Sequence, residues 1–370
     1  MGKLQLAGRM RGMLRTLVPA NLKIAHSYNG EFPTVEQNGL TARCHRDWPQ
    51  ETAFLDQWKA LLARNPQMTP FCSPAWQSSV LDEFVPAGKF RLLTVHRGDD
   101  LLAILPLSFN TASMLETAGR WVTDYMEPLV DAACAEECWA IMLQQLVNLW
   151  DWSVGGIILH HIRHDSPLRT LLPPVAAKYG FTFEESVVDV NPMIALPATW
   201  DEYLARLDGH ERKEVKRKIR NAQTKSNARW LTLTKIEEVE TAMERALSAL
   251  RQSDSFKADF CEEILIPFLR RLIPKLTKAG DFYINELWLE EQPAAWLFAL
   301  RSNQGPMIYN TSYDFSKRNL SPGAVAFALA IQDAINAGYP CFNLLRGGEE
   351  YKKRLEAVDA QLLRFTLKPK

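Results

Sequence analysis

The stretch from Met307 to Leu355 constrains this chain most, because it places a glycine-containing turn between a strand and a helix. The residues MIYNTSYDF are typical of a strand, AVAFALAIQDAINAG has apolar residues at helical spacing, and CFNLL indicates a second strand. Before the helix, Ser321 can cap it, Pro322 suits its first position, and Gly323 lets a ligand approach the backbone. A helix start of this kind presents free N–H groups to an anion. A well-capped helix without a ligand is the alternative.

The composition of the 370 residues is that of a soluble globular protein of two domains. Hydrophobic residues make up 47%, and 43 Lys and Arg balance 43 Asp and Glu. A chain of zero net charge has no general attraction for nucleic acid, so recognition of anions must be local. No run approaches the ~20 apolar residues of a membrane span, and the basic N-terminus lacks the apolar core of a secretory signal.

The cysteines and histidines indicate neither a metal site nor a redox motif. Six cysteines are scattered without a C-x-x-C pair, at Cys44, Cys72, Cys134, Cys138, Cys261 and Cys341. Reduced thiols of this kind fit a cytoplasmic protein. Of His160, His161 and His164, only the last two have a metal-ligand spacing, and no carboxylate cluster adjoins them. We therefore expect no metal.

The order of expected elements repeats along the chain. A helix over 51–64 and a second helix from Pro74, capped by Ser73, precede a hairpin around 97–100, then further strands, a helix and a strand. The second half again has helices, a hairpin around 290–292, a strand, a helix and a strand. This order predicts an internal duplication. We expect a poorly ordered leader at 1–45, a first domain at 46–192 and a second at 193–370.

The second half resembles the acyl-CoA-binding core of the GNAT acyltransferases, which carry a Q/R-x-x-G-x-G/A signature at the turn. Here the signature reads Arg318-Asn319-Leu320-Ser321-Pro322-Gly323, with serine in place of the first glycine. The segments FCSPAWQ, AILPL, TDYMEPLV, KEVKRKIRNA and GYPCFNLLRGGEEYKKRL are similar in order to the cellulose-biosynthesis-type, Fem-like acetyltransferases. The resemblance implies an α/β fold of tandem GNAT-like domains, each a mixed, mostly antiparallel sheet flanked by helices.

The resemblance also implies acyl transfer from acetyl-CoA or another acyl-CoA, often near exopolysaccharide synthesis. It assigns CoA to the second half, because the equivalent turn in the first half, around Asp131 to Cys134, has neither glycine nor arginine. The cofactor-binding residues that we expect on this basis are Tyr313, Arg318, Asn319, Ser321, Gly323, Ala324 and Asn343.

Acyl transfer needs a base for the acceptor and an acid for the departing thiolate. By resemblance Tyr351 protonates the thiolate, and Glu349, Glu350 or Asp314 is the candidate base. Each has a structural alternative. The glutamates can favour a helix dipole, the tyrosine ring can pack in the core, and Asp314 can cap the turn.

The helix HERKEVKRKIRNAQ has many cations around a narrow apolar stripe of Val215 and Ile219. It is either a solvated face or an anion site for CoA phosphates or an anionic acceptor. In the first half, Asp124 and Tyr125 can face the cleft between the domains and help to bind the acceptor, or Tyr125 can be a buried tyrosine with a hydrogen-bonded hydroxyl. The substrate-binding residues that we expect are Asp124, Tyr125, Lys213, Lys216, Arg217 and Lys352.

Two further functions stay open beside acyl transfer to a small-molecule or glycan acceptor. One is a non-catalytic tandem GNAT-like module that binds a carbohydrate-assembly protein or a nucleotide-linked sugar. The missing glycine favours it. The other is Fem-like aminoacyl transfer from charged tRNA, with the basic helix as the RNA contact. The neutral overall charge favours no nucleic acid partner. The protein can also belong to a peripheral membrane or polysaccharide-synthesis complex.

Overall fold

The computed structural model describes residues 32, 34–150, 155–251 and 261–370, and the chain divides into two compact units. One unit contains the described residues up to Asp189 together with Gln361–Lys370, and the other runs from Val190 to Ala360. We describe them separately as the first and the second unit. The sequence placed residues 361–370 with the second domain, whereas their contacts place them with the first.

The first unit is a mixed sheet with helices. Its strands follow the order β1-β2-β3-β4-β5-β7-β14-β8, with β6 beside β4. They span Val35–Gln37 (β1), Leu40–His45 (β2), Phe90–Arg97 (β3), Asp100–Phe109 (β4), Leu115–Thr117 (β5), Leu129–Val130 (β6), Ile157–Arg163 (β7), Phe181–Ala195 (β8) and Val358–Pro369 (β14). The helices are Thr52–Ala63 (α2), Pro74–Phe84 (α3), Ala135–Trp150 (α4) and Leu168–Lys178 (α5), with short 3-10 turns at Pro70–Cys72 (η1) and Ala132–Cys134 (η2).

Several local expectations for this unit are confirmed. The helix expected over 51–64 is α2, and Ser73 caps α3 because its hydroxyl accepts a hydrogen bond from the Trp76 N–H at 3.2 Å. The hairpin around 97–100 joins β3 to β4. The poorly ordered leader expected at 1–45 does not hold for 35–45, which form β1 and β2, because β2 pairs with β3. Residues 1–31 and 33 lie outside the described part.

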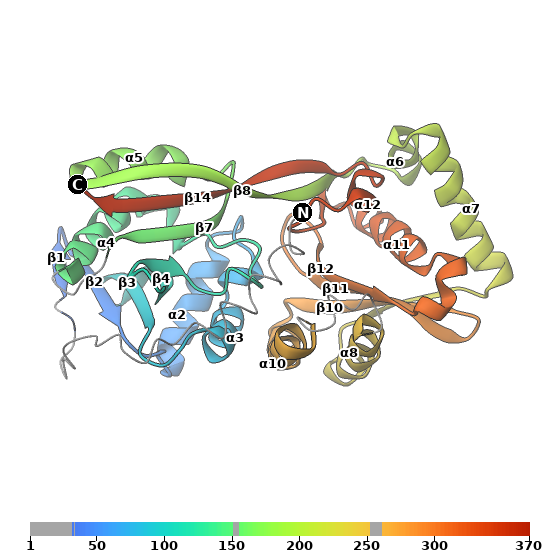
Figure 1. The fold of residues 1–370 in the computed structure, drawn as a ribbon, viewed down its shortest axis with the longest axis horizontal. Helices are drawn as coiled ribbons and strands as arrows, with labels where there is room; N and C mark the ends of the chain where they lie inside the picture. Colours follow the sequence, from blue (N-terminus) through green and yellow to red (C-terminus); the bar gives the residue numbers. More distant parts are fainter. Residues whose placement is uncertain (1–31, 33, 151–154, 252–260) are drawn as a thin grey trace. The chain divides into compact units, whose positions relative to one another are not determined.

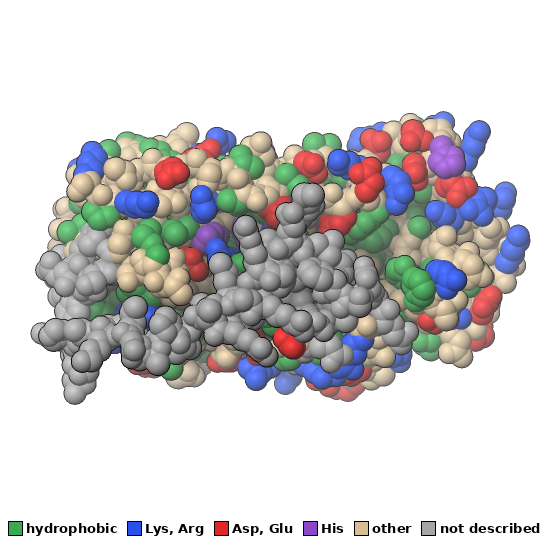
Figure 2. Space-filling model, in the orientation of Figure 1, with side chains coloured by type: hydrophobic (Ala, Val, Ile, Leu, Met, Phe, Trp, Pro, Cys, Tyr) green, Lys and Arg blue, Asp and Glu red, His purple; other side chains and the backbone are tan. Residues whose placement is uncertain are grey.

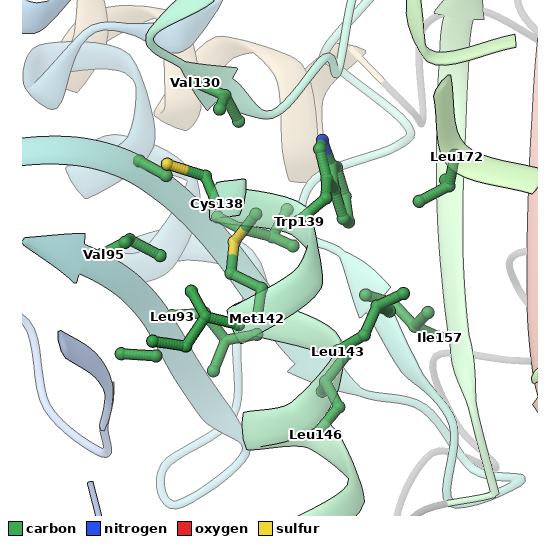
Figure 3. Close-up of a cluster of buried hydrophobic side chains, with 14 of the residues drawn as sticks. Leu93, Val95, Val130, Cys138, Trp139, Met142, Leu143, Leu146, Ile157 and Leu172 are labelled. Carbon is green, nitrogen blue, oxygen red and sulfur yellow. The ribbon is translucent and has the colours of Figure 1, made fainter. Parts of the chain in front are cut away.

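The core of the first unit forms where α4 packs on its sheet. Figure 3 shows Trp139, Met142 and Leu143 of α4 among side chains of the strands and of α5. Trp139, Met142 and Leu143 are each fully buried. Leu363, Phe365 and Leu367 of β14 belong to the same core. Burial of apolar side chains of this size stabilises by about 1.5–3 kcal/mol each, which is why β14 is held in the first unit.

The second unit is a sheet covered on both faces. Its strands follow the order β8-β13-β12-β11-β10-β9, and β12 and β13 are parallel. Beyond the end of β8, they span Arg229–Leu233 (β9), Phe282–Leu289 (β10), Gln292–Leu300 (β11), Met307–Tyr313 (β12) and Cys341–Asn343 (β13). The helices are Trp200–Arg206 (α6), Gly209–Lys225 (α7), Ile236–Arg251 (α8), Ile266–Ala279 (α10), Pro322–Asn336 (α11) and Glu350–Lys353 (α12), with short helical turns at Cys261–Leu265 (η3) and Phe315–Leu320 (η4).

The helices α8 and α10 lie on one face of the second unit's sheet, and α11 and α12 lie on the other (Figure 1). In both units a hairpin leads to a strand, a helix and a second strand parallel to the first, with β5 and β7 in one unit and β12 and β13 in the other. The expected mixed α/β fold with a repeated order of elements is confirmed. Within the described residues, no helix is both long and apolar enough to cross a membrane.

One buried histidine makes the stability of the first unit depend on pH. Burial, with Arg43 and His45, lowers the pKa of His96 to about 4, whereas an unfolded histidine titrates near 6.5. As the pH falls through this window, the unfolded chain binds a proton that the folded chain does not. The free energy of unfolding should therefore fall by roughly 1–2 kcal/mol between pH 6.5 and 4.5.

Denaturant unfolding at several pH values measures this fall in the free energy of unfolding. In His96→Gln the fall should be smaller than in the wild type. The exposed His210 provides the control, because His210→Gln should leave the decline unchanged. Equal slopes for the wild type and His96→Gln would refute the assignment.

Candidate active site

The strands β12 and β13 separate soon after they meet. Their parallel ladder has one residue pair, Met307 with Asn343. On its other side β12 carries a bulge, because Phe298 of β11 pairs with Asn310 while Ala299 pairs with Ile308, which leaves Tyr309 as the extra residue. A bulge bends its strand. The second unit therefore has a gap between two parallel strands at the carboxyl end of β12, ahead of α11.

The start of α11 lies directly after this strand end. Ser321 adopts the left-handed conformation, with φ 54° and ψ 47°, and its carbonyl accepts from the Val325 N–H at 3.1 Å. The expected side-chain cap is absent, because capping needs an extended backbone at this residue. The left-handed conformation costs a non-glycine residue about 1–2 kcal/mol. Serine here thus keeps the backbone shape that glycine prefers, although the signature's glycine is missing.

The first turn of α11 has the properties of an anion site. Pro322 has no N–H, so the amides of Gly323 and Ala324 are the first that can point out of the helix. A Cβ placed on Gly323 would meet only Cδ1 of Tyr313, at 3.7 Å. Packing therefore does not require glycine at this position, and its small size leaves the approach to the two amides open.

Most of the predicted cofactor-binding residues lie together around this turn. Arg318 and Asn319 are exposed on η4, and the guanidinium of Arg318 lies 5.0 Å from the centre of the Phe315 ring. Tyr313 flanks Gly323, and Ser321 and Ala324 belong to the turn itself. Their contact with a cofactor stays a prediction.

Tyr351 on α12 packs against the second turn of α11. Its ring centre lies 5.4 Å from that of Phe327. Burial, and then the charge of Glu349, raise the pKa of Tyr351 well above its ordinary value. Its phenol therefore keeps its proton at neutral pH, as a proton donor must. The packing alternative for the ring is thus observed, and it is compatible with the predicted role.

The candidate bases differ in their surroundings. Glu349 forms an ion pair with Lys352 at 2.9 Å, whereas Glu350 is exposed at the first position of α12. Asp314 caps η4, since its Oδ1 accepts from the amide of Ser316 at 2.9 Å and from its hydroxyl at 2.7 Å. The capping alternative for Asp314 is therefore realised, and the choice of base stays a prediction.

A buried ammonium fixes the chain where it leaves β13. Lys352 is 3% exposed, and its Nζ donates to the carbonyls of Leu345, Arg346 and Gly347 at 2.9, 3.2 and 2.9 Å. Asn343 supports the same loop, because its Oδ1 accepts from the Leu345 N–H at 2.8 Å. For the predicted substrate contact, the Lys352 ammonium would have to leave these carbonyls.

Removing this ammonium should loosen the loop. Lys352→Met leaves three buried carbonyls unpaired, so we expect about 2–3 kcal/mol of destabilisation in denaturant unfolding. The exposed neighbour Lys353 is the matched control, and Lys353→Met should stay within about 0.5 kcal/mol of the wild type. Equal stabilities of the two variants would contradict the role of the Lys352 hydrogen bonds.

Two features were missed by reasoning from the sequence. A recess of 530 Å³ on the α8 face of the second unit is lined by Asp314, Lys317, Trp296 and Arg245 among others. Beneath it, the 1% exposed Glu286 accepts from Arg245 and from the indole N–H of Trp296. A lone glutamate in a strand gives no sequence signal for this.

The other feature is Asn191 on β8, beside the loop that Lys352 holds. Asn191 is fully buried, and among the described residues neither its side-chain nitrogen nor its oxygen has a hydrogen-bond partner. The adjacent Val190 and Pro192 carbonyls accept from Gly347 and Leu344. A buried amide of this kind costs about 1–3 kcal/mol unless another group binds it.

In the first unit the matching strand gap is filled by its own chain. The segment 119–126 follows β5 and bonds to β7, since the Met126 N–H donates to the His161 carbonyl at 3.3 Å. His161 Nδ1 lies 2.9 Å from the Thr123 carbonyl, and His161 adopts φ 50°. Asp124 and Tyr125 lie in this segment and are 0% and 5% exposed. The burial expected by the alternative is thus observed, and the contact of these two residues with a substrate stays a prediction.

The basic helix is α7, and Figure 2 shows Lys and Arg side chains gathered over it. Arg217 is bound by Glu214 through two hydrogen bonds of 2.9 and 2.7 Å. Lys213 and Lys216 are exposed and form no ion pair with the described residues. Val215 packs on the core of the second unit. No group of three or more potential metal ligands occurs among the described residues.

Comparisons with known proteins agree with this geometry. Residues 209–353 match the family model of the acetyltransferase (GNAT) domain. The chain is similar to the crystal structure of FemX, with 10% identity, a TM-score of 0.60, and coverage of 84% of this chain and 95% of that one. It is also similar to a conserved protein of unknown function from Bacteroides thetaiotaomicron VPI-5482, with 13% identity, a TM-score of 0.53, and coverage of 85% and 97%. No curated protein matches the sequence.

The fold is therefore that of the GNAT acyltransferases, and the expected resemblance, Fem-like in form, is confirmed. The residues that match the GNAT-domain model contain both the gap after β12 and the start of α11.

Proposed function

We propose that this protein transfers an acyl group, most simply acetyl, from acyl-CoA to an amine or hydroxyl. The observation that carries the proposal is the start of α11, where an open glycine exposes two amides beside a gap between parallel strands. The amides and the helix dipole suit a pyrophosphate. The separated strand β12 offers backbone groups to the pantetheine amides.

The residues of the second unit can supply each proton transfer. The acceptor nucleophile attacks the thioester carbonyl and loses its proton to a carboxylate, for which Glu350 is the most accessible candidate. The carbon–sulfur bond then breaks, and the thiolate takes the phenolic proton of Tyr351. Solvent returns a proton to the tyrosine. Holding both reactants in the gap supplies much of the rate.

We further propose a cytoplasmic enzyme whose acceptor belongs to exopolysaccharide or cell-envelope carbohydrate synthesis. The cations Lys213, Lys216 and Arg217 on α7 suit a phosphorylated or polyanionic acceptor. The resemblance of the sequence to the cellulose-biosynthesis-type, Fem-like acetyltransferases supports this assignment.

Binding of acetyl-CoA tests the donor site. A ligand at 100 times its dissociation constant stabilises the folded state by about 2.7 kcal/mol, so acetyl-CoA should raise the Tm of the wild type. Gly323→Asp should abolish the rise, because its carboxylate repels phosphate while suiting the helix start. Gly209 also begins a helix in open space, and Gly209→Asp should keep the rise. Absence of any rise in the wild type would refute the donor assignment.

Turnover tests the proton donor. Tyr351→Phe should lower kcat about 100-fold and leave the acetyl-CoA-induced rise in Tm unchanged, because the ring stays and only the proton is lost. The exposed Tyr339 is the control, and Tyr339→Phe should keep full activity. Equal kcat in Tyr351→Phe and the wild type would exclude Tyr351 as the acid. Binding without turnover in the wild type would favour the non-catalytic module.

The exposed cations of α7 favour a second candidate function, which is aminoacyl transfer from charged tRNA. Strong, salt-dependent binding of tRNA, lost in Lys213→Glu and Lys216→Glu, would support it over acyl-CoA chemistry.

A further inference from the structure

Two aromatic rings beside the start of α11 are left open to solvent. The side chains of Tyr313 and Phe315 are 40% and 50% exposed. Their ring centres lie 6.5 Å apart and their planes differ by 29°, so the rings stack with an offset. The Arg318 guanidinium lies 5.0 Å from the centre of the Phe315 ring. We call Tyr313, Phe315 and Arg318 the aromatic shelf.

The fold itself makes little use of the shelf. Phe315 begins η4, and none of the six residues of that turn is buried. Arg318 is exposed and forms no ion pair with the described residues. An exposed pair of large rings costs free energy in water unless a ligand covers it. The shelf therefore offers a ligand an apolar surface together with the positive charge of Arg318, which lies over the Phe315 ring.

The aromatic shelf lies next to the start of α11. Cδ1 of Tyr313 lies 3.7 Å from where a Cβ on Gly323 would be, so the shelf adjoins the amides proposed for the pyrophosphate. A ligand that carries a phosphate close to a flat heterocycle can contact both at once. Nucleotides have this chemistry, because every base has a π-face that stacks on aromatic side chains.

We propose that the aromatic shelf binds the adenine base of CoA, with Arg318 over the 3′-phosphate, and so selects nucleotide-bearing donors. The inference rests on the proposed function and adds a donor specificity to it. A thioester on 4′-phosphopantetheine, free or attached to a carrier protein, has the same reactive end and lacks the base. Phe315 is a binding residue for the base, and it takes no part in the chemical step.

Titration calorimetry with three ligands tests the shelf. CoA should bind the wild type at least about 10-fold more tightly than 4′-phosphopantetheine, in line with stacking of one base. Phe315→Ala should lower the affinity for CoA about 10- to 100-fold and leave the affinity for 4′-phosphopantetheine unchanged. Phe315→Trp should keep tight CoA binding. Arg318→Ala should lower the affinity for CoA more than the affinity for dephospho-CoA, because dephospho-CoA lacks the 3′-phosphate.

The exposed Tyr339 is the matched control, and Tyr339→Ala should bind all three ligands like the wild type. Equal affinity of the wild type for CoA and 4′-phosphopantetheine would refute binding of the base by the aromatic shelf. The acyltransferase proposal would still hold. Equal losses for both ligands in Phe315→Ala would assign the ring a structural role and also refute binding of the base. Absence of binding by every one of these ligands would overturn the donor assignment together with the shelf.

Discussion

The buried ammonium of Lys352 is the interaction on which the candidate site depends. A gap between parallel strands is unfavourable, because separated backbone groups lose their ladder partners. The chain after β13 therefore needs another source of order, and Lys352 supplies it through three carbonyls. Burying a lysine is costly unless it is fully hydrogen-bonded, so this loop has few alternative arrangements. Lys352 therefore fixes the chain on one side of the gap.

The local parts of this structure could be predicted from the sequence. The start of α3 at Ser73 and Pro74 and the hairpin joining β3 to β4 depend on neighbouring residues only. The start of α11 was also placed correctly, but the conformation of Ser321 was not. Capping residues and left-handed residues can have the same identity, and the choice between them depends on the approach of the preceding turn η4.

Contacts between distant residues could not be predicted in this way. Lys352 was expected to bind the substrate, since nothing in the neighbouring sequence indicates that its ammonium donates to three carbonyls at 345–347. Glu286 and the indole donor Trp296 lie on neighbouring strands, and their meeting depends on the register of β10 with β11. The two halves also share an order of elements while their strand gaps differ. In the first unit the segment that follows β5 fills the gap, whereas no backbone hydrogen bond among the described residues joins the segment after β12 to β13.

The path of β14 has a consequence for the synthesis of the chain. The first unit needs Leu363, Phe365 and Leu367 for its core, and these residues are made after the whole of the second unit. A ribosome therefore delivers the first 189 residues with one strand position in their sheet still vacant. Until residue 367 emerges, β7 presents an unpaired edge that can capture a strand from another chain. The protein thus completes its first unit last.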